Sequence, residues 1–234
     1  MSANSSEPRH LIFDADDTLW DSNIHFLEAF AEFAAAATRS NPGIREKSAA
    51  EAVRRAELKL IKTHGYGRRP YVLALHQAAD ELAANGRAGA LHAAIDEIGE
   101  RLCTRECPLL PDVAETVEAL ARRHRLVLFT KGQRDEQLRK LARSGLDKHF
   151  SRVDTPREKD VDAYRRLILD AQLHPERAWM IGNSPRSDIN PSVRAGLHAV
   201  YIPHPHTWEL EEEELDFDDR IVRIGSFRGL LDLF

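Results

Sequence analysis

The residues whose types and spacing most clearly predict chemistry lie at 10–20, where the sequence reads HLIFDADDTLW. A short apolar run is followed directly by Asp14, Asp16 and Asp17. If the run is a buried strand, Asp14 emerges at its carboxyl end, where open α/β sheets place their ligands. Neighbouring carboxylates repel one another unless a cation or a proton lies among them. The spacing therefore favours a catalytic or cation-binding site over the structural alternative, a capped strand end.

Short apolar runs predict the strands that must surround this site. They lie at 11–13, 126–129, 178–181 and 199–202, with 221–224 as a weaker candidate. Helical patterns separate them, and strands that alternate with helices are typical of a mainly parallel, doubly wound sheet. The predicted fold class is therefore α/β.

The interval after Trp20 departs from this alternation. Residues 22–107 show almost no strand pattern and contain many Ala, Glu, Leu and Arg residues. Helical periodicity predicts helices over 24–38, 47–64, 70–84 and 88–105, with a turn at Asn85 and Gly86 before the last. We expect two domains. Residues 1–21 and 108–234 form a catalytic core, and residues 22–107 form an inserted all-helical domain.

Polar side chains follow the other predicted strands as well. Thr130 and Lys131 come after the second run and before a predicted helix. A hydroxyl and the backbone N–H groups of such a turn can hold a phosphoryl oxygen. Lys159 precedes another predicted helix, and residues 182–188 follow the third run. Because the carboxyl ends of parallel strands meet at one edge of a sheet, these groups are expected close to Asp14.

In this order, the segments resemble the four motifs of phosphatases in the haloacid dehalogenase superfamily. Residues 14–18 (DADDT) match the first motif, Thr130 the second, Lys159 the third and residues 182–188 the fourth. The insertion at 22–107 is similar to the family's helical cap of the C1 type, so the resemblance covers the whole chain. It implies a Rossmann-like core and a phosphoric monoester hydrolase.

The resemblance implies a role for each matching residue. Asp14 would be the nucleophile and form an aspartyl-phosphate, which divides a difficult hydrolysis into two displacements. Asp16 would act as general acid and then as base, which requires a pKa nearer neutrality than that of an exposed Asp. Mg²⁺ would be held by Asp14, the backbone carbonyl of Asp16 and Asp188. The transferring phosphoryl group would be bound by Thr130, Lys131 and Lys159.

Position 183 departs from the family pattern. The phosphatases usually carry an acid there, whereas this chain has Asn183, as the metal-independent dehalogenases of the superfamily do. Asn183 could still hydrogen-bond a metal-bound water or Lys159. Asp16 favours the phosphatase, because an alkoxide that leaves phosphorus benefits from a proton and a halide needs none. A 2-haloacid dehalogenase, a phosphomutase and a non-catalytic ligand-binding or regulatory protein stay open as alternatives.

In capped members of the superfamily, substrate choice is implied to come from cap side chains. The basic stretch 62–69 includes two candidate contacts, Tyr66 between two glycines and Arg68. If this loop faces the site, it favours a substrate with a second anionic group or a ring, such as a sugar phosphate or a nucleotide. The acidic run 209–214 is expected to be solvated, and His204 is expected in a loop rather than on a metal.

Composition limits the partners. The 234 residues carry a formal net charge of −5, which gives no general attraction to nucleic acid or anionic membranes. No apolar run approaches the ~20 residues that span a bilayer. Residues 1–9 lack the apolar core of a signal peptide. We expect a cytoplasmic monomer or homodimer that acts on a small-molecule phosphate ester with Mg²⁺.

Overall fold

The computed structural model describes residues 7–83 and 88–234. The chain divides into two compact units, which are described separately. The α/β unit consists of Met1–Asp21 and Cys107–Phe234, and the helical unit consists of Ser22–Glu106. The predicted turn at 85–86, the end of the predicted helix 70–84 and the first six residues lie outside the described residues.

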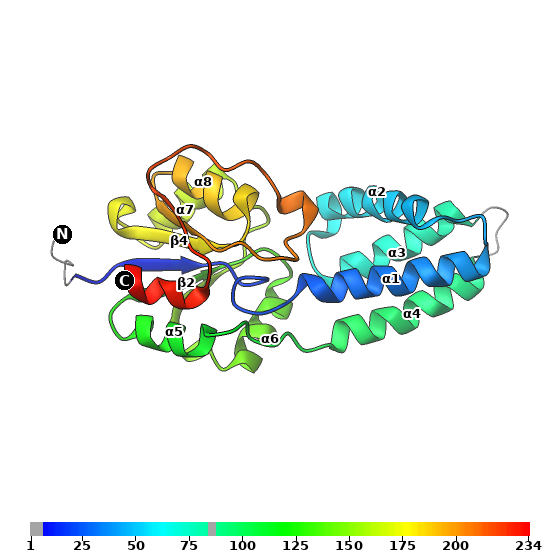
Figure 1. The fold of residues 1–234 in the computed structure, drawn as a ribbon, viewed down its shortest axis with the longest axis horizontal. Coiled ribbons are helices and arrows are strands. Elements are labelled where there is room, and N and C mark those ends of the chain that lie inside the picture. The colour runs from blue at the N-terminus through cyan, green and yellow to red at the C-terminus, as the bar shows by residue number, and fades with distance from the viewer. Residues whose placement is uncertain (1–6, 84–87) are drawn as a thin grey trace. The chain divides into compact units, whose positions relative to one another are not determined.

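The α/β unit is built on a parallel sheet (Figure 1). Within the described residues this sheet has six strands in the order β3-β2-β1-β4-β5-β6. The strands are β1 (His10–Phe13), β2 (Arg125–Phe129), β3 (Phe150–Asp154), β4 (Ala178–Gly182), β5 (His198–Tyr201) and β6 (Ile221–Arg223). The predicted α/β fold class is therefore confirmed.

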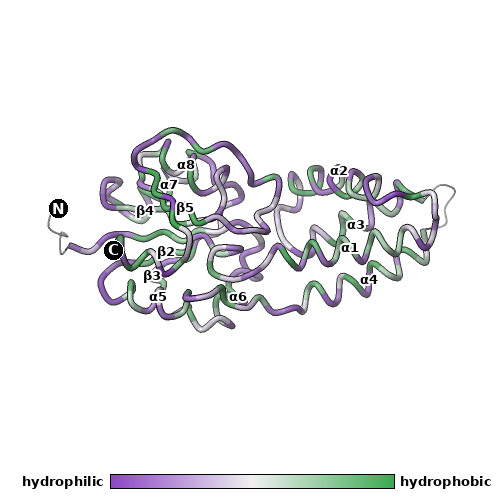
Figure 2. Tube along the Cα trace, in the orientation of Figure 1, coloured by the Kyte–Doolittle hydropathy of each residue, from purple (hydrophilic) through white to green (hydrophobic). Residues whose placement is uncertain are grey.

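Helices cover both faces of the sheet, and alternate residues of each strand pack against opposite helical layers. Leu11 and Phe13 of β1 belong to a core that includes residues of α5 (Val113–Ala121) and α9 (Leu230–Leu233). Ile12, between them, belongs to a second core with residues of α7 (Val161–Asp170). A stretch of strand that is buried on both faces is a continuous apolar run, as residues 126–129 of β2 are (Figure 2). The unit also contains α6 (Arg134–Ser144) and α8 (Asn190–Arg194).

The strand β3 is the one part of the sheet that the sequence does not predict. Its residues FSRVD include a serine and an arginine, and only Phe150 is buried. It lies at the edge of the sheet and pairs with β2 through a register shift between Leu126 and Val127. An edge strand needs no continuous apolar run, so its pattern is weak.

The helical unit contains α1 (Asn23–Ser40), α2 (Glu46–His64), α3 (Arg68–Leu82) and α4 (Gly89–Thr104). Its core combines large side chains such as Phe33, Leu75 and Ile95 with many buried alanines, which allow helices to approach closely. No helix in the described ranges is long and apolar enough to cross a membrane.

The predicted basic loop at 62–69 is shorter in the structure. Helix α2 continues to His64 and α3 starts at Arg68, so only three residues connect them. Gly65 and Gly67 have φ values of 73° and 133°, which side chains rarely adopt. The two glycines therefore make the tight connection between the helices and hold Tyr66 at its centre.

Candidate active site

Asp14 lies at the point where the strand order of the sheet reverses. It follows β1, whose neighbours are β2 on one side and β4 on the other. Its backbone N–H donates to the carbonyl of Ile181 in β4 at 2.9 Å. Ligands of open α/β sheets bind at this topological switch point, outside the carboxyl ends of the strands. The fold alone thus places Asp14 in a ligand-binding position.

Lys159 joins Asp14 to the fourth predicted motif. Its ammonium donates to Oδ1 of Asp14 and, at 2.6 Å, to Oδ1 of Asp188. All three residues are buried, with 4%, 7% and 0% of their surface exposed respectively. Lys159 is positioned by the start of α7, where Asp160 caps the helix by accepting from the N–H of Ala163 at 2.8 Å. Three sequence-predicted residues from distant motifs therefore meet.

The buried charges of this group are not balanced. Burial raises the pKa of Asp14 to about 7, which Lys159 opposes and the nearby Asp188 carboxylate reinforces. Burial also raises the pKa of Asp188 against the effect of Lys159. Burial would lower the pKa of Lys159, but the two carboxylates outweigh it and raise that pKa above its ordinary value. One ammonium compensates only part of the charge of two buried carboxylates.

The Asp188 carboxylate is held in a close-fitting backbone cradle. Oδ2 accepts from the N–H of Ser184 at 3.0 Å. A Cβ atom at Gly182 would lie only 2.2 Å from that oxygen, so no other residue type leaves room for it. A short π-helical turn, Pro185–Ile189, carries Asp188. It is capped by Ser184, whose Oγ accepts from the N–H of Ser187 at 2.9 Å.

These residues suit Mg²⁺ as a cofactor. Asp14 and Asp188 converge on a single point, the Lys159 ammonium, and they offer only oxygen ligands, which Mg²⁺ prefers. Burial raises the pKa of both carboxylates, and a divalent cation would stabilise their ionised forms. The donor set and the charge both fit the predicted metal.

Asn183 contributes to a chain of hydrogen bonds that ends at Asp14. Its Oδ1 accepts from the Thr18 hydroxyl at 3.1 Å, and Thr18 also lies 3.3 Å from Oδ2 of Asp14. Its Nδ2 donates to Thr207 at 3.0 Å. The amide thus bonds two threonines, and Lys159 is not among these partners. Thr18 and Thr207 are positioning groups that the sequence analysis did not single out.

Asp16 is held as an ionised carboxylate. Its oxygens accept from Trp20 Nε1 at 2.7 Å, Gln137 Nε2 at 2.8 Å and Lys140 Nζ at 2.8 Å. Burial would raise its pKa, but the Lys140 charge and these three donors outweigh burial and hold the pKa at about 2. The predicted pKa nearer neutrality is therefore wrong for this arrangement. The reason is Lys140, more than a hundred residues away along the chain.

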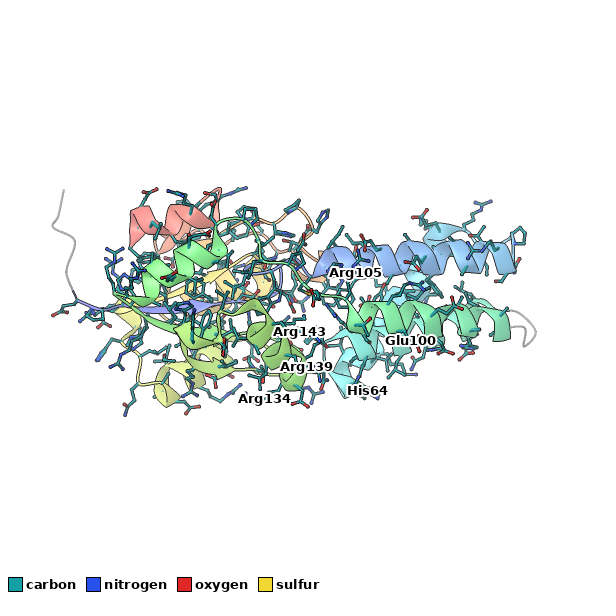
Figure 3. The ribbon with its side chains drawn as sticks, turned by 90° about the horizontal axis from the view of Figure 1, so that it is seen from below. His64, Glu100, Arg105, Arg134, Arg139 and Arg143 are labelled. Carbon is teal, nitrogen blue, oxygen red and sulfur yellow. The ribbon has the colours of Figure 1, made fainter. Side chains whose placement is uncertain are left out.

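Helix α6 explains why Lys140 reaches Asp16. Gln137 and Lys140 lie on the side of the helix that faces the sheet edge, where both bond Asp16. The same helix also carries three exposed arginines, Arg134, Arg139 and Arg143 (Figure 3). The polar helix therefore presents two of its many polar side chains to the site. Its sequence does not show which two.

Thr130 and Lys131 differ in their surroundings. Thr130 is buried directly after β2. The Lys131 ammonium donates to the Ser187 hydroxyl at 2.9 Å and forms an ion pair with Glu211. Glu211 also accepts from Ser184 at 2.6 Å, and Lys131 and these hydroxyls lower its pKa against the effect of burial. The prediction that the run 209–214 is solvated is therefore wrong at Glu211, which supports the site.

The two candidate contacts in the helical unit also differ. Tyr66 is partly exposed in the connection between α2 and α3. Arg68 is buried and donates from Nη1 to the carbonyl of Arg105 at 2.7 Å, just after the end of α4. Arg68 thus caps a helix within its own unit, whereas a substrate contact would need its guanidinium at a surface.

His204 lies in the loop after β5, as expected, but close to two carboxylates. Its Nδ1 is 3.9 Å from Asp17 and its Nε2 is 3.8 Å from Asp21. The ligand atoms of the three residues lie within 4.8 Å of one another. Burial lowers the pKa of His204, against the effect of Asp21. This group is separate from the predicted Mg²⁺ ligands.

Comparison with known proteins defines the class. A family profile described as haloacid dehalogenase-like hydrolase matches residues 8–196. The chain therefore belongs to the haloacid dehalogenase-like hydrolases, and the predicted membership is confirmed. The doubly wound sheet and the order of the motif residues along its edge agree with this assignment.

Individual relatives include both phosphatases and dehalogenases. The chain is 36% identical over 131 residues to a phosphoserine phosphatase from Thermus thermophilus, and the match spans 53% of this chain and 50% of the relative. A haloacid dehalogenase-like hydrolase from Xanthomonas campestris is 27% identical, with a TM-score of 0.78 over 97% of this chain and 94% of that one. The L-2-haloacid dehalogenase from Xanthobacter autotrophicus shares the fold at 17% identity, with a TM-score of 0.59 over 97% and 98%.

Proposed function

We propose that the protein is a Mg²⁺-dependent phosphatase that hydrolyses small phosphomonoesters through an aspartyl-phosphate on Asp14. The observation that carries the proposal is the buried group of Asp14, Lys159 and Asp188 at the switch point of the sheet. It combines a nucleophile, a fixed positive charge and a second carboxylate that requires a cation. The phosphoserine phosphatase similar to one half of this chain supports the same chemistry.

In the proposed reaction, an oxygen of Asp14 forms a bond to phosphorus as the bond to the substrate alkoxide breaks. Lys159 holds the Asp14 carboxylate in place and offsets charge on the transferring group. A water molecule then forms a bond to phosphorus, and the bond to Asp14 breaks to release phosphate. Bound Mg²⁺ would reduce the repulsion between the carboxylate and the phosphate dianion and polarise the phosphoryl oxygens.

Asp16 is proposed to take a proton from solvent before the reaction, to give it to the leaving alkoxide, and then, as a carboxylate, to take one from the attacking water. In the structure it is ionised and bonded to Lys140, Gln137 and Trp20. It must separate from Lys140 to carry a proton, because the ammonium stabilises only the ionised form. Proton transfer by Asp16 thus requires a rearrangement of its side chain, and the hydrogen bonds from Gln137 and Lys140 of α6 oppose that rearrangement.

The helical unit is proposed to act as the cap that selects the substrate. Tyr66 remains its candidate contact, since it lies partly exposed in a connection of three residues. Sugar phosphates and nucleotides are the substrate classes that a ring contact and the nearby basic residues favour. A phosphorylated amino acid joins them, because the similar Thermus thermophilus protein is a phosphoserine phosphatase.

The test is hydrolysis of p-nitrophenyl phosphate by the purified full chain. We expect activity that EDTA abolishes and Mg²⁺ restores, and that Asp14→Asn removes without changing the circular dichroism spectrum. A panel of sugar phosphates, nucleotides and phosphoserine then ranks substrates by kcat/KM. Release of chloride from 2-chloropropionate without metal, together with no phosphate release across the panel, would instead show a dehalogenase.

A further inference from the structure

A group of four polar side chains in the helical unit is independent of the candidate active site. Helix α3 carries His76 and Asp80, and α4 carries His92 and Asp96. In each pair the residues are four positions apart, so they lie on one face of their helix. Each histidine lies next to the aspartate of the other helix. His92 Nε2 lies 2.9 Å from Oδ1 of Asp80, and His76 Nε2 lies 3.3 Å from Oδ1 of Asp96.

The two imidazole rings meet edge to edge. Their Nδ1 atoms are 2.7 Å apart, their ring centres are 5.0 Å apart and their planes differ by 18°. The rings are therefore nearly coplanar, and the two nitrogens point at each other. A hydrogen bond of this length needs one nitrogen that carries hydrogen and one that accepts. A single proton is thus shared between the two Nδ1 atoms.

The carboxylates determine which nitrogens carry the other protons. His92 Nε2 bonds an aspartate oxygen, which can only accept, so this nitrogen carries hydrogen, and Asp96 lies 3.3 Å from His76 Nε2, where it can accept in the same way. The lone pairs of both Nδ1 atoms are then directed at one point between the rings. A histidine that ligates a metal through one nitrogen almost always donates its other N–H to a carboxylate or a carbonyl. His92 has this arrangement already, and Asp96 is close enough to orient His76 in the same way.

We propose that His76 and His92 bind a divalent transition-metal ion such as Zn²⁺ through their Nδ1 atoms, oriented by Asp80 and Asp96. The ion takes the place of the shared proton, which is released to the solvent. Imidazole nitrogen is a preferred ligand of Zn²⁺, Cu²⁺ and Ni²⁺ and a poor one for Mg²⁺. The charge is also favourable, because two carboxylates flank the ion.

The geometry permits the exchange with small movements. Nitrogen ligands lie ~2.0–2.1 Å from Zn²⁺ in a tetrahedral site, which places two of them roughly 3.3 Å apart. The two Nδ1 atoms must separate by about 0.6 Å from their present 2.7 Å, and each ring must tilt so that the lone pairs meet at a tetrahedral angle. The side chains of His76 and His92 are 26% and 31% exposed, so they have room to move and solvent can reach the ion. Two protein ligands leave the remaining positions to water.

The experiment is isothermal titration of the full chain with ZnCl₂ in the presence of saturating Mg²⁺, which occupies the oxygen-ligand site. We expect one Zn²⁺ per chain at the histidine pair. His76→Ala and His92→Ala should each weaken binding by at least about tenfold, because each removes one of two ligands. The double variant Asp80→Asn with Asp96→Asn should weaken it about 10–100-fold while both ligands remain.

His174→Ala is the matched control, because His174 is an exposed histidine of the α/β unit with a carboxylate at 3.9 Å. It should leave Zn²⁺ binding unchanged. All variants alter exposed or partly exposed side chains, and their circular dichroism spectra check that they fold. The proposal is overturned if the wild type binds no Zn²⁺, or if His76→Ala and His92→Ala bind it as the wild type does. The pair would then share a proton only.

Discussion

Replacing Gly182 by alanine tests whether the position of Asp188 controls activity. The backbone at Gly182 does not have the left-handed φ that would itself penalise alanine. The effect of the added methyl group therefore comes from its neighbours. These are Oδ2, Cγ and Cβ of Asp188, at 2.2, 2.5 and 2.7 Å from the ideal Cβ position. The added methyl group therefore displaces the Asp188 carboxylate.

The required displacement can be worked out from these distances. Ordinary van der Waals contact begins at 3.4 Å, so Oδ2 at 2.2 Å must move by at least 1.2 Å. Asp188 is fully buried and bonded to Lys159 and Ser184, so the movement breaks at least one of these contacts. A misplacement of about 1 Å costs on the order of 10²-fold in rate, and overpacking costs about 1–3 kcal/mol in stability.

The assay measures kcat/KM for p-nitrophenyl phosphate against Mg²⁺ concentration, with urea unfolding to record stability. We expect kcat/KM to fall about 100-fold or more and the half-saturating Mg²⁺ concentration to rise. Gly89→Ala is the control, since nothing lies within 4 Å of its added Cβ, and it should leave both quantities unchanged. Wild-type kcat/KM and Mg²⁺ dependence in Gly182→Ala would show that the position of Asp188 does not control activity.

Three further substitutions test other parts of the structure. Lys159→Met leaves Asp14 and Asp188 without their shared ammonium, so kcat/KM should fall by at least about 10³-fold, and near-normal activity would contradict its role. Glu211→Gln removes the partner of Lys131 and should cost about 3 kcal/mol in urea unfolding at pH 7. Because the pKa of Glu211 is lowered in the folded state, its contribution to the free energy of unfolding is present above its ordinary pKa of 4.5 and is lost as pH falls below that value. The difference in unfolding free energy between wild type and Glu211→Gln should therefore become smaller in acid. A difference that does not change with pH would count against the ion pair. Arg68→Met should destabilise the helical unit by about 1–2 kcal/mol, because the hydrogen bond to the Arg105 carbonyl is lost. The control Arg69→Met alters an exposed side chain and should have little effect. Equal losses of stability in the two variants would argue against the role of Arg68 at the end of α4.

The core of the site could be predicted because strand topology brings it together. Asp14 and residues 182–188 follow adjacent parallel strands, so their proximity needs only the fold class. Lys159 precedes a helix that the sequence predicts at nearly its observed bounds, 161–170. Each of these residues also lies in a motif that the family resemblance identifies.

The supporting residues could not be predicted, because they depend on tertiary contacts. Lys140 and Gln137 lie on a helix with many polar side chains, and only packing against the sheet selects the two that reach Asp16. Glu211 lies in an acidic run that is typical of a solvated loop, and its buried ion pair with Lys131 overrides that pattern. The pairing of His76 with His92 similarly requires two helices to lie side by side.

The proposed function depends on the transfer of a phosphoryl group from the substrate to Asp14. The most direct measurement is acid quenching of the full chain during turnover of p-nitrophenyl phosphate with Mg²⁺, followed by digestion and mass spectrometry of the peptide that contains Asp14. We predict one phosphoryl group on Asp14 in the wild type and none in Asp14→Asn. Hydrolysis without this intermediate, or a phosphoryl group on another residue, would show that Asp14 is not the nucleophile.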